Sequence, residues 1–267
     1  MIGVNLIVCN RTPTHRKATE VAVRSLLESD LALFPSAKLV AVDNGSADDT
    51  AGWLRAEGFR VEALPENLGI APARNFATTT LLEDPTLWAV VEVHNDMVFP
   101  KRWLLPLLEV LEADPEVGIA CASLMTPKGI LGSPRVPIEY IWPEERIREV
   151  VENAAIGARR PGILRPGLQH PCAKRSVMLR EIGLYDEGFR WGNFEDTDEV
   201  YRAAKAGWKY VVVGDAVVWH HYWLSRLELD PDHGKSYREN FRRFVEKWPD
   251  ARGFLFTYQQ QTEAIYR

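Results

Sequence analysis

The first 120 residues of the chain alternate short apolar runs with amphipathic helical patterns. Strands are expected over residues 4–8, 39–42, 61–64 and 88–96, with helices over residues 16–29, 51–57 and 73–82 between them. Strand-helix-strand units of this kind join parallel neighbours through right-handed crossovers. The pattern therefore predicts an α/β fold built on a single Rossmann-like, doubly wound, mostly parallel sheet.

The fourth of these strands begins at Trp88 and ends in His94-Asn95-Asp96. Open α/β sheets bind their ligands at the carboxyl ends of strands, so the Asp96 carboxylate is expected at the site. A carboxylate with an imidazole two residues earlier can hold a hard divalent cation, which in turn can hold a diphosphate. Alternatively, Asn95 and Asp96 cap a helix that begins near Pro100.

Size and composition favour one domain with a large core, since 46% of the 267 residues are hydrophobic. A net charge of −5 argues against non-specific binding to nucleic acid. Cys9, Cys121 and Cys172 form no CxxC pair, so neither a zinc site nor a disulfide is indicated, and a reduced cytoplasmic setting is expected. The N-terminus does not resemble a signal peptide and no apolar run is long enough to span a membrane.

The second half of the chain is less regular. Residues 126–165 are rich in proline and glycine apart from a helical pattern over residues 144–158, and they are expected to form a mobile lid on the acceptor side. Strands are expected over residues 210–213 and 216–219, the second ending in His220-His221. The basic amphipathic helix over residues 235–248 either touches a membrane or polyanion, or, as we favour, is a solvated helix with Phe241, Phe244 and Trp248 packing inward.

Five motifs follow one another in an order that resembles family 2 glycosyltransferases of the GT-A fold, and most closely their rhamnosyltransferase-like branch. They are Val42-Asp43-Asn44-Gly45-Ser46; Asn67-Leu68-Gly69 with Ala73-Arg74-Asn75; His94-Asn95-Asp96; Gly183-Leu184-Tyr185-Asp186-Glu187 with Phe194-Glu195-Asp196-Thr197-Asp198; and Val218-Trp219-His220. We expect one GT-A domain over residues 1–267, with a nucleotide-sugar half (1–123), an acceptor and catalytic half (124–234) and a C-terminal helix and tail (235–267).

The resemblance implies which residues bind the donor. Asp43 would contact the nucleotide base or ribose, with Asn10 nearby; Arg74 and Asn75 would face the nucleotide sugar, and Asn95 would belong to the same pocket. Arg74 is chemically suited to a phosphate or carboxylate. The structural alternatives are loop capping by Asp43 and Asn10, and a solvated helix face that carries Arg74 and Asn75.

The family's Asp-x-Asp motif binds a divalent metal, either Mn²⁺ or Mg²⁺, that carries the donor diphosphate. Here Asp96 matches the second acid, and His94 replaces the first with a softer, uncharged ligand. His220 matches a histidine that completes the site in some relatives, whereas strand alternation turns His221 away. Glu92 lies on the same strand face as His94 and Asp96; it either adds negative charge to the metal site or, as we favour, is a paired core carboxylate.

The implied reaction transfers a sugar from a nucleoside diphosphate sugar to an acceptor hydroxyl with inversion. Asp196 would be the general base, while Glu195 would bind the acceptor or orient its neighbour. Trp191, Gly192 and Asn193 would form a sugar-binding wall on the acceptor side.

Structural roles compete with this interpretation of the acidic cluster. Asp198 has the spacing for a surface ion pair with Arg202, and Glu199 then decorates the same helix start.

Two other functions remain open at this stage. A sugar nucleotidyltransferase would share the sheet and metal site, but residues 9–13 lack its glycine-rich phosphate loop. A non-catalytic sugar-binding relative is suggested only by His94 in place of an acid. The acceptor is expected to be a glycan, a lipid-linked intermediate or a small molecule, with a modified DNA base least expected, and the protein to be cytoplasmic or peripheral at the membrane.

Overall fold

The computed structural model describes residues 1–126, 129–130, 144–157, 164–166, 170–221, 233–251 and 253–254. Within these residues the strands form one sheet, in the order β3-β2-β1-β4-β9-β6-β10-β5, with β7 paired to β6 and β8 to β10. The strands are β1 (Ile2–Val8), β2 (Lys38–Asn44), β3 (Arg60–Leu64), β4 (Ala89–His94), β5 (Met97–Val98), β6 (Val117–Thr126), β7 (Gly129–Ile130), β8 (Leu164–Pro166), β9 (Cys172–Arg175) and β10 (Lys209–His220). The helices are α1 (Pro13–Leu27), η1 (Asp30–Leu33), α2 (Thr50–Ala56), α3 (Ile70–Leu82), α4 (Leu104–Ala113), α5 (Glu144–Gly157), α6 (Ser176–Ile182), α7 (Glu195–Lys205) and α9 (His233–Lys247).

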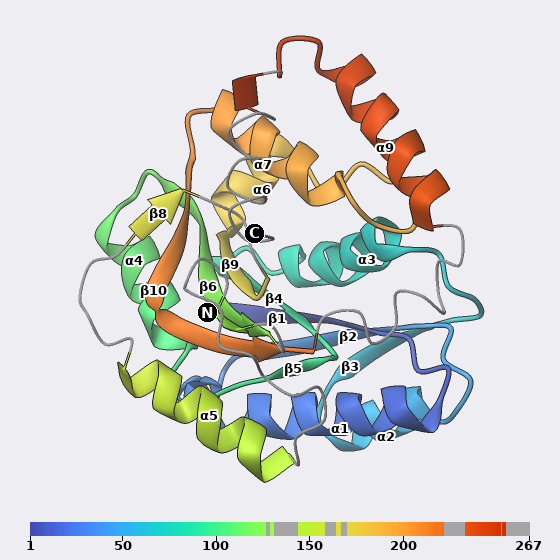
Figure 1. The fold of residues 1–267 in the computed structure, drawn as a ribbon, viewed down its shortest axis with the longest axis vertical. Helices are drawn as coiled ribbons and strands as arrows, with labels where there is room; N and C mark the ends of the chain where they lie inside the picture. Colours follow the sequence, from blue (N-terminus) through green and yellow to red (C-terminus); the bar gives the residue numbers. More distant parts are fainter. Residues whose placement is uncertain are drawn as a thin grey trace.

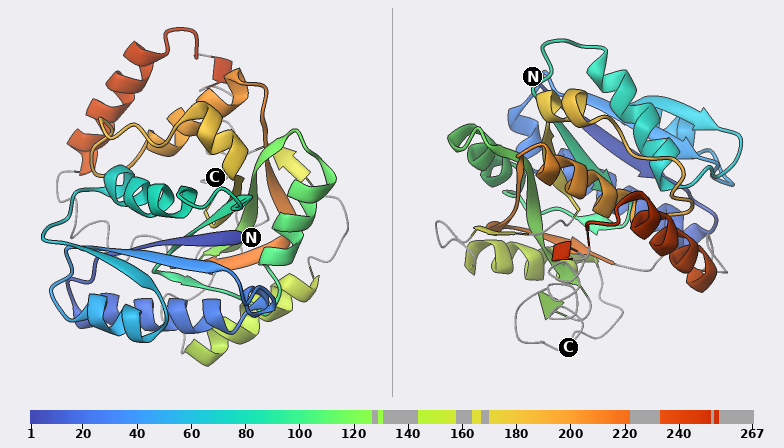
Figure 2. Two further views of the ribbon diagram at one scale, coloured as in Figure 1. Left: turned by 180° about the vertical axis from the view of Figure 1, so that it is seen from behind. Right: turned by 90° about the horizontal axis from the view of Figure 1, so that it is seen from above.

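Helices cover both faces of the sheet, as the alternating pattern predicts (Figure 1). One face packs on α1, α2 and α4, and the other on α3, α6 and α7. The view from behind shows α9 as an outer layer above α3 (Figure 2). The prediction of an α/β, doubly wound fold is confirmed.

Strand directions divide the sheet into two halves. Neighbours from β3 through β2 and β1 to β4 are all parallel. In the second half, β9 runs antiparallel to both β4 and β6, and β5 antiparallel to β10. Strands β6 and β10 of the second half are parallel to each other. The prediction of a mostly parallel sheet therefore holds from β3 to β4 and for this pair, and it fails where β9 and β5 join the sheet. Residues 209–220 form one strand instead of the two predicted, with an irregular register between Val213 and Val217.

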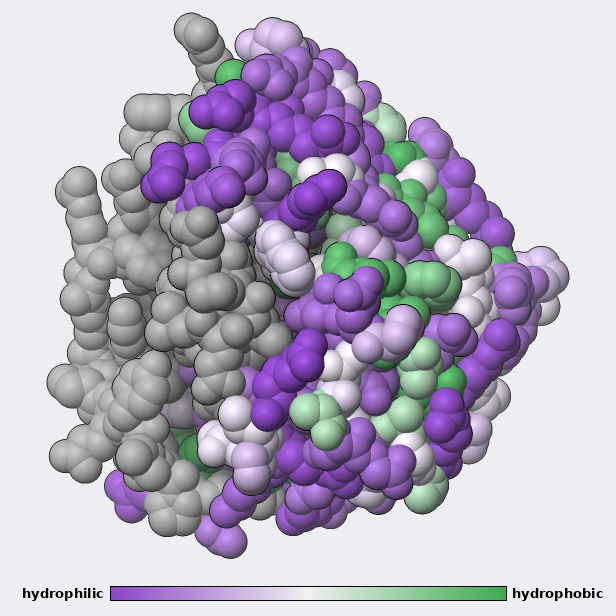
Figure 3. All heavy atoms as spheres, turned by 90° about the vertical axis from the view of Figure 1, so that its right-hand side faces the viewer, coloured by the Kyte–Doolittle hydropathy of each residue, from purple (hydrophilic) through white to green (hydrophobic). Residues whose placement is uncertain are grey.

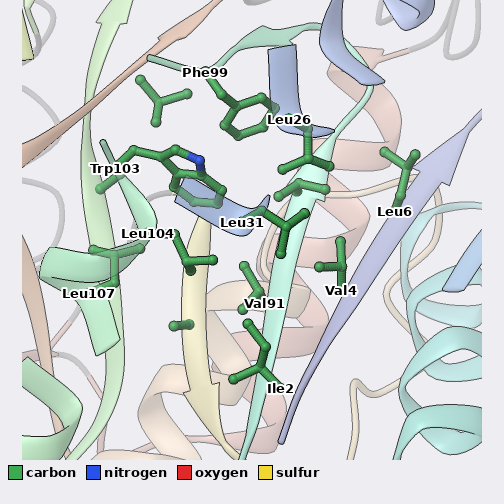
Figure 4. Packing of buried hydrophobic residues seen from close by; sticks show 14 of the residues in the cluster. Ile2, Val4, Leu6, Leu26, Leu31, Val91, Phe99, Trp103, Leu104 and Leu107 are labelled. Carbon is green, nitrogen blue, oxygen red and sulfur yellow. The ribbon is translucent and has the colours of Figure 1, made fainter. Parts of the chain in front are cut away.

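Helix α4 begins where Trp103 and Leu104 enter the apolar core and bond the buried Asp30 carboxylate. Trp103, Leu104 and Leu107 belong to the same buried cluster as Leu6 of β1 and Val91 of β4 (Figure 4). Helix α4 itself packs on β6, β9 and β10. The backbone amides of Trp103, Leu104 and Leu105 donate to the buried Asp30 carboxylate, at 2.8–3.2 Å. Because Asp30 caps α4, the alternative in which Asn95 and Asp96 cap that helix is wrong.

One further local prediction needs correction. On α9, Phe244 is buried as predicted, but Phe241 is 45% exposed. The predicted lid lies mostly outside the described residues, which include only Thr126, β7, α5 and the start of β8 from that stretch. None of the described helices is long and apolar enough to cross a membrane.

Candidate active site

The carboxyl ends of the parallel strands open onto the right-hand side of Figure 1. Val8 at the end of β1 pairs with Asp43 on β2, and Ile7 pairs with His94 on β4. Asp43 and His94 therefore lie at nearly the same level on either side of β1. Figure 3 looks onto this edge and shows apolar side chains in the middle of a mostly hydrophilic face.

Antiparallel pairing between β5 and β10 brings a distant histidine to Asp96. Met97 pairs with His220, so the turn that carries Asp96 meets the end of β10. The His220 Nε2 atom lies 3.0 Å from Asp96 Oδ1, and the His94 and His220 rings meet edge-on at 5.4 Å. Ligand atoms of His94, Asp96 and His220 all lie within 4.8 Å of one another.

The protonation states of two of these groups suit a divalent cation. Burial, reinforced by His170 and Arg74, holds the pKa of His94 well below its usual range, so its imidazole is neutral and keeps a lone pair. Burial opposes ionisation of Asp96, but His220 outweighs it and lowers the carboxyl pKa. One carboxylate and two imidazoles form a mixed nitrogen and oxygen donor set that suits Mn²⁺. The residues present therefore fit a metal.

Glu92, two residues before His94 on β4, is a paired core carboxylate as the sequence favours. Its Oε2 atom lies 2.8 Å from Lys174 Nζ, 2.8 Å from the Tyr185 hydroxyl and 3.2 Å from His170 Nε2. Glu92, His170 and Cys172 also lie close enough to surround an ion. The Lys174 ammonium already supplies the cation there, so this cluster does not fit a second metal.

The motifs at β2 and after β3 interlock beside Asp43. Asn44 donates to Asn67 Oδ1 and to the Gly69 carbonyl, and the Leu68 amide donates back to Asn44. Gly69 has φ of +91°, and a Cβ there would lie 3.2 Å from the Trp191 nitrogen. A glycine at this position therefore lets the 190–194 loop approach the donor side of the edge.

The predicted donor residues lie at this edge at different depths. Asp43 is buried, and its Oδ1 accepts from the Ser46 amide at 3.0 Å. Asn10 is buried between Thr50 and Thr19, and the half-buried Asn95 donates to the same Thr19 hydroxyl at 2.9 Å. The capping interpretation thus describes the Asp43 carboxylate, which accepts from a loop amide, whereas the Asn10 side chain bonds two threonine hydroxyls.

Arg74 and Asn75 hold the scaffold together. Arg74 is 1% exposed and donates to the Asn5 and Val93 carbonyls at 2.7 and 2.8 Å, which ties the middle of β1 to the end of β4. Asn75 exchanges two hydrogen bonds with the Tyr185 backbone. Neither the expected open pocket nor a solvated helix face describes Arg74, because its guanidinium points into the core, where it satisfies strand-end carbonyls.

The 190–194 loop has an unusual backbone. Trp191, Asn193 and Phe194 have φ between +65° and +72°, and Gly192 has φ of +119°. Asn240 on α9 stabilises the loop by donating to the Arg190, Gly192 and Asn193 carbonyls at 2.8–3.0 Å. Consecutive left-handed residues that are over-determined by their surroundings are typical of functional sites. Trp191 is 46% exposed.

The acids of α7 have different surroundings. Glu195 is buried and Asp196 is half-buried, and Asp196 accepts from the Thr197 amide at 2.7 Å. Asp198 pairs with Arg202 as predicted, but it is 0% exposed and also accepts from Lys247 and Trp248, each at 2.8 Å. The prediction of a surface pair was wrong, because α9 covers this side of α7.

Sequence reasoning missed the groups that surround Glu92. Lys174 bonds Glu92 and Glu199, and the His170 ring stacks on His94 with centroids 4.9 Å apart. Burial opposes a charge on His170, but Cys172 and Glu92 outweigh it and raise its pKa to about 9. A charged residue directly after the apolar pair Cys172-Ala173 was the one signal of a buried lysine.

Comparison with known proteins identifies the family. Residues 4–182 match the model named "Glycosyl transferase family 2". The chain therefore belongs to glycosyl transferase family 2, and the prediction of a glycosyltransferase is confirmed. This assignment replaces the sugar nucleotidyltransferase alternative. No curated protein matches the chain in a sequence search.

Solved structures of similar fold include three glycosyltransferases. GalNAc-T7 with UDP, GalNAc and Mn²⁺ has a TM-score of 0.65 and 16% identity, over 94% of this chain and 48% of that one. TarS 1-349 from S. aureus, in complex with UDP, has a TM-score of 0.58 and 15% identity, over 94% and 73%. PcManGT, a mannosyltransferase from Pyrobaculum calidifontis in complex with GDP-Man and Mn²⁺, has a TM-score of 0.59 and 17% identity, over 92% and 64%. The chain thus spans about half of GalNAc-T7, and the likeness confirms the GT-A fold.

Proposed function

We propose that this chain transfers a sugar, with inversion, from a nucleoside diphosphate sugar to an acceptor hydroxyl. The convergence of His94, Asp96 and His220 at the carboxyl edge of the sheet carries the proposal. Bound Mn²⁺ or Mg²⁺ would offset the negative charge that develops on the leaving diphosphate. Mn²⁺ in the GalNAc-T7 and PcManGT structures supports manganese as the metal.

The donor half of the site is assigned to residues 1–123. Asp43 contacts the base or ribose, because its carboxylate lies at the strand edge level with His94. Asn95 is half-buried beside the metal ligands and contributes to the donor pocket. Arg74 and Asn75 act through the backbone carbonyls that their side chains bond. Asn10 acts through the hydroxyls of Thr19 and Thr50.

The acceptor half is assigned to residues 124–234. Asp196 takes the proton of the acceptor hydroxyl as its oxygen attacks the anomeric carbon from the side opposite the diphosphate. Glu195 orients the acceptor. The loop of Trp191, Gly192 and Asn193 holds the acceptor, and the exposed Trp191 ring offers a flat apolar face on which a sugar can stack.

Three further parts of the proposal concern the branch of the family, the acceptor and the location of the protein. The motif resemblance favours the rhamnosyltransferase-like branch of the family, and a glycan, a lipid-linked intermediate or a small molecule is favoured as acceptor over a modified DNA base. The C-terminal helix and tail are assigned to residues 235–267. On α9, exposed Tyr237 and Phe241 flank exposed Arg238 and Arg242, which supports a peripheral position on an acidic membrane surface of the cytoplasm.

A thermal-shift panel of nucleoside diphosphate sugars, with and without Mn²⁺, tests this function. A ligand at 100 times its Kd stabilises the native state by about 2.7 kcal/mol, so the correct donor raises Tm when Mn²⁺ is present. Asp96→Ala should lose this response. If no donor raises the Tm of the wild type under either condition, the proposed donor site is wrong.

A further inference from the structure

Lys174 is a fully buried lysine between two carboxylates. It lies on β9 with 0% exposure, and its Nζ is 2.8 Å from Glu92, 2.6 Å from Glu199 and 2.6 Å from the Tyr185 hydroxyl. Burial opposes the charge, but Glu199 and Glu92 outweigh it and raise the lysine pKa, so the ammonium persists at neutral pH.

The two carboxylates belong to opposite sides of the candidate active site. Glu92 precedes the proposed metal ligand His94 by two residues on β4, and Glu199 follows the proposed base Asp196 by three residues on α7. Lys174 therefore bonds the strand that carries the metal ligands to the helix that carries the base. A second path runs from Glu92 through His170, whose ring stacks on His94.

We propose that Lys174 is a positioning residue that sets the first turns of α7 at the correct distance from the metal ligands. This inference rests on the proposed function, because it assumes that Asp196 and His94 act on one substrate. Lys174 touches neither substrate nor metal; it acts through Glu92 and Glu199.

Stabilisation of the fold does not by itself explain a buried lysine between two carboxylates. Replacing a buried ion pair by apolar residues of similar volume is often neutral, whereas removing one partner leaves an uncompensated charge. A bridge of three charges with fixed geometry does specify the relative position of the elements it joins. The experiment must therefore separate the effect of Lys174 on stability from its effect on the position of α7 relative to β4.

The test compares Lys174→Met, the double variant Lys174→Met/Glu199→Gln and wild type. In the single variant two carboxylates lose their common cation, so both Tm and kcat should fall. In the double variant the second charge is removed, and Glu92 retains His170 and Tyr185. Tm should recover most of its loss, while kcat for transfer stays at least tenfold below wild type and the Kd for Mn²⁺ stays within threefold.

Hydrogen exchange supplies a readout that needs no activity. Amides in the first two turns of α7 should exchange at least tenfold faster in the double variant, with β4 amides unchanged. The control, Arg202→Met/Asp198→Asn, neutralises another buried pair on α7 that does not reach β4. Its Tm should fall, while its kcat, measured well below that Tm, should remain close to that of wild type.

Two results would overturn the inference: kcat that recovers together with Tm in Lys174→Met/Glu199→Gln, or unchanged exchange in α7. Failure of the proposed function would look different. In that case wild type itself would show neither Mn²⁺-dependent donor binding nor transfer, whereas α7 exchange would still report whether Lys174 positions the helix.

Discussion

Two acid-histidine clusters lie at the end of β4 and in the turn that follows it, and they differ in how the charge of the acid is compensated. Glu92 is 1% exposed and contacts Lys174 and His170, so its negative charge is compensated by the protein. Asp96 contacts His220 and lies near His94, whose depressed pKa leaves it neutral. The first cluster is complete, whereas the second presents lone pairs and a carboxylate to a cation from solution.

The difference shows that a count of ligand-type residues does not identify a metal site. Each cluster contains three residues whose ligand atoms lie within 4.8 Å of one another. A buried acid needs a counter-charge, and the relevant question is whether a lysine or arginine already provides it. Lys174 does so for Glu92, so substitutions in the two clusters should have separable effects.

The largest effect is expected at a third acid, Asp196. Asp196→Asn keeps the shape but removes the basicity, so kcat should fall by about 10²–10⁴-fold. Donor and Mn²⁺ affinity should remain unchanged, because the donor is assigned to Asp43 and Asn95 and the metal to His94, Asp96 and His220. Steady-state kinetics with calorimetric donor binding measure both quantities. If transfer remains near normal, the base lies elsewhere, and Glu195→Gln becomes the next variant to measure.

Glu92→Gln sharpens the contrast with the metal cluster. It removes the charge that compensates Lys174 and should lower the free energy of unfolding by about 2–4 kcal/mol. The affinity for Mn²⁺ should change by less than about threefold. Urea unfolding and a Mn²⁺ titration of the same sample provide the comparison. A large loss of Mn²⁺ affinity in a folded variant would place Glu92 in the metal site.

Asp198→Asn tests the burial of the acid that the sequence assigned to the surface. Its carboxylate holds Arg202, Lys247 and Trp248 under α9, so the variant should lose about 1–3 kcal/mol of stability. Its kcat at a temperature well below Tm should remain close to that of wild type. An exposed ion pair is worth only about 0–1 kcal/mol, and a loss in that range would contradict the buried geometry.

The smallest effect is a pH dependence at Asp186. Burial opposes ionisation, but Lys247, the Gly188 amide and Arg243 outweigh it and lower the pKa of Asp186 to about 2. Because the folded pKa is depressed, the stabilisation is complete above about pH 4 and is lost as pH falls towards 2, by about 1–2 kcal/mol. Urea unfolding across this window should show the slope in wild type. Asp186→Asn should lack this contribution, and an unchanged slope would exclude Asp186 as its source.

The sequence predicted most of the first half of the fold, because its period-two and helical patterns depend on local burial. It also predicted that His94, Asp96 and His220 belong together, although only the β5–β10 pairing brings the third ligand to the others. The exposure of individual side chains was harder to predict from the sequence. Arg74 and Asp198 lie beneath neighbouring elements, and no local pattern encodes which helix covers a given face.

Lys174 was missed for a related reason. Its partners Glu92 and Glu199 are 82 and 25 residues away, so its burial and charge depend on contacts between distant elements. Antiparallel β9 interrupts the regular alternation that guided the rest of the prediction.

The central claim is that the Asp96 cluster, and not the Glu92 cluster, takes a divalent cation that supports donor binding. Titration of Mn²⁺ into chelator-treated protein, followed by electron paramagnetic resonance, tests it most directly. We expect one site in wild type and in Glu92→Gln, and at least tenfold weaker binding, about 1.4 kcal/mol, in Asp96→Ala. Equal Mn²⁺ affinity in Asp96→Ala and wild type would contradict the account.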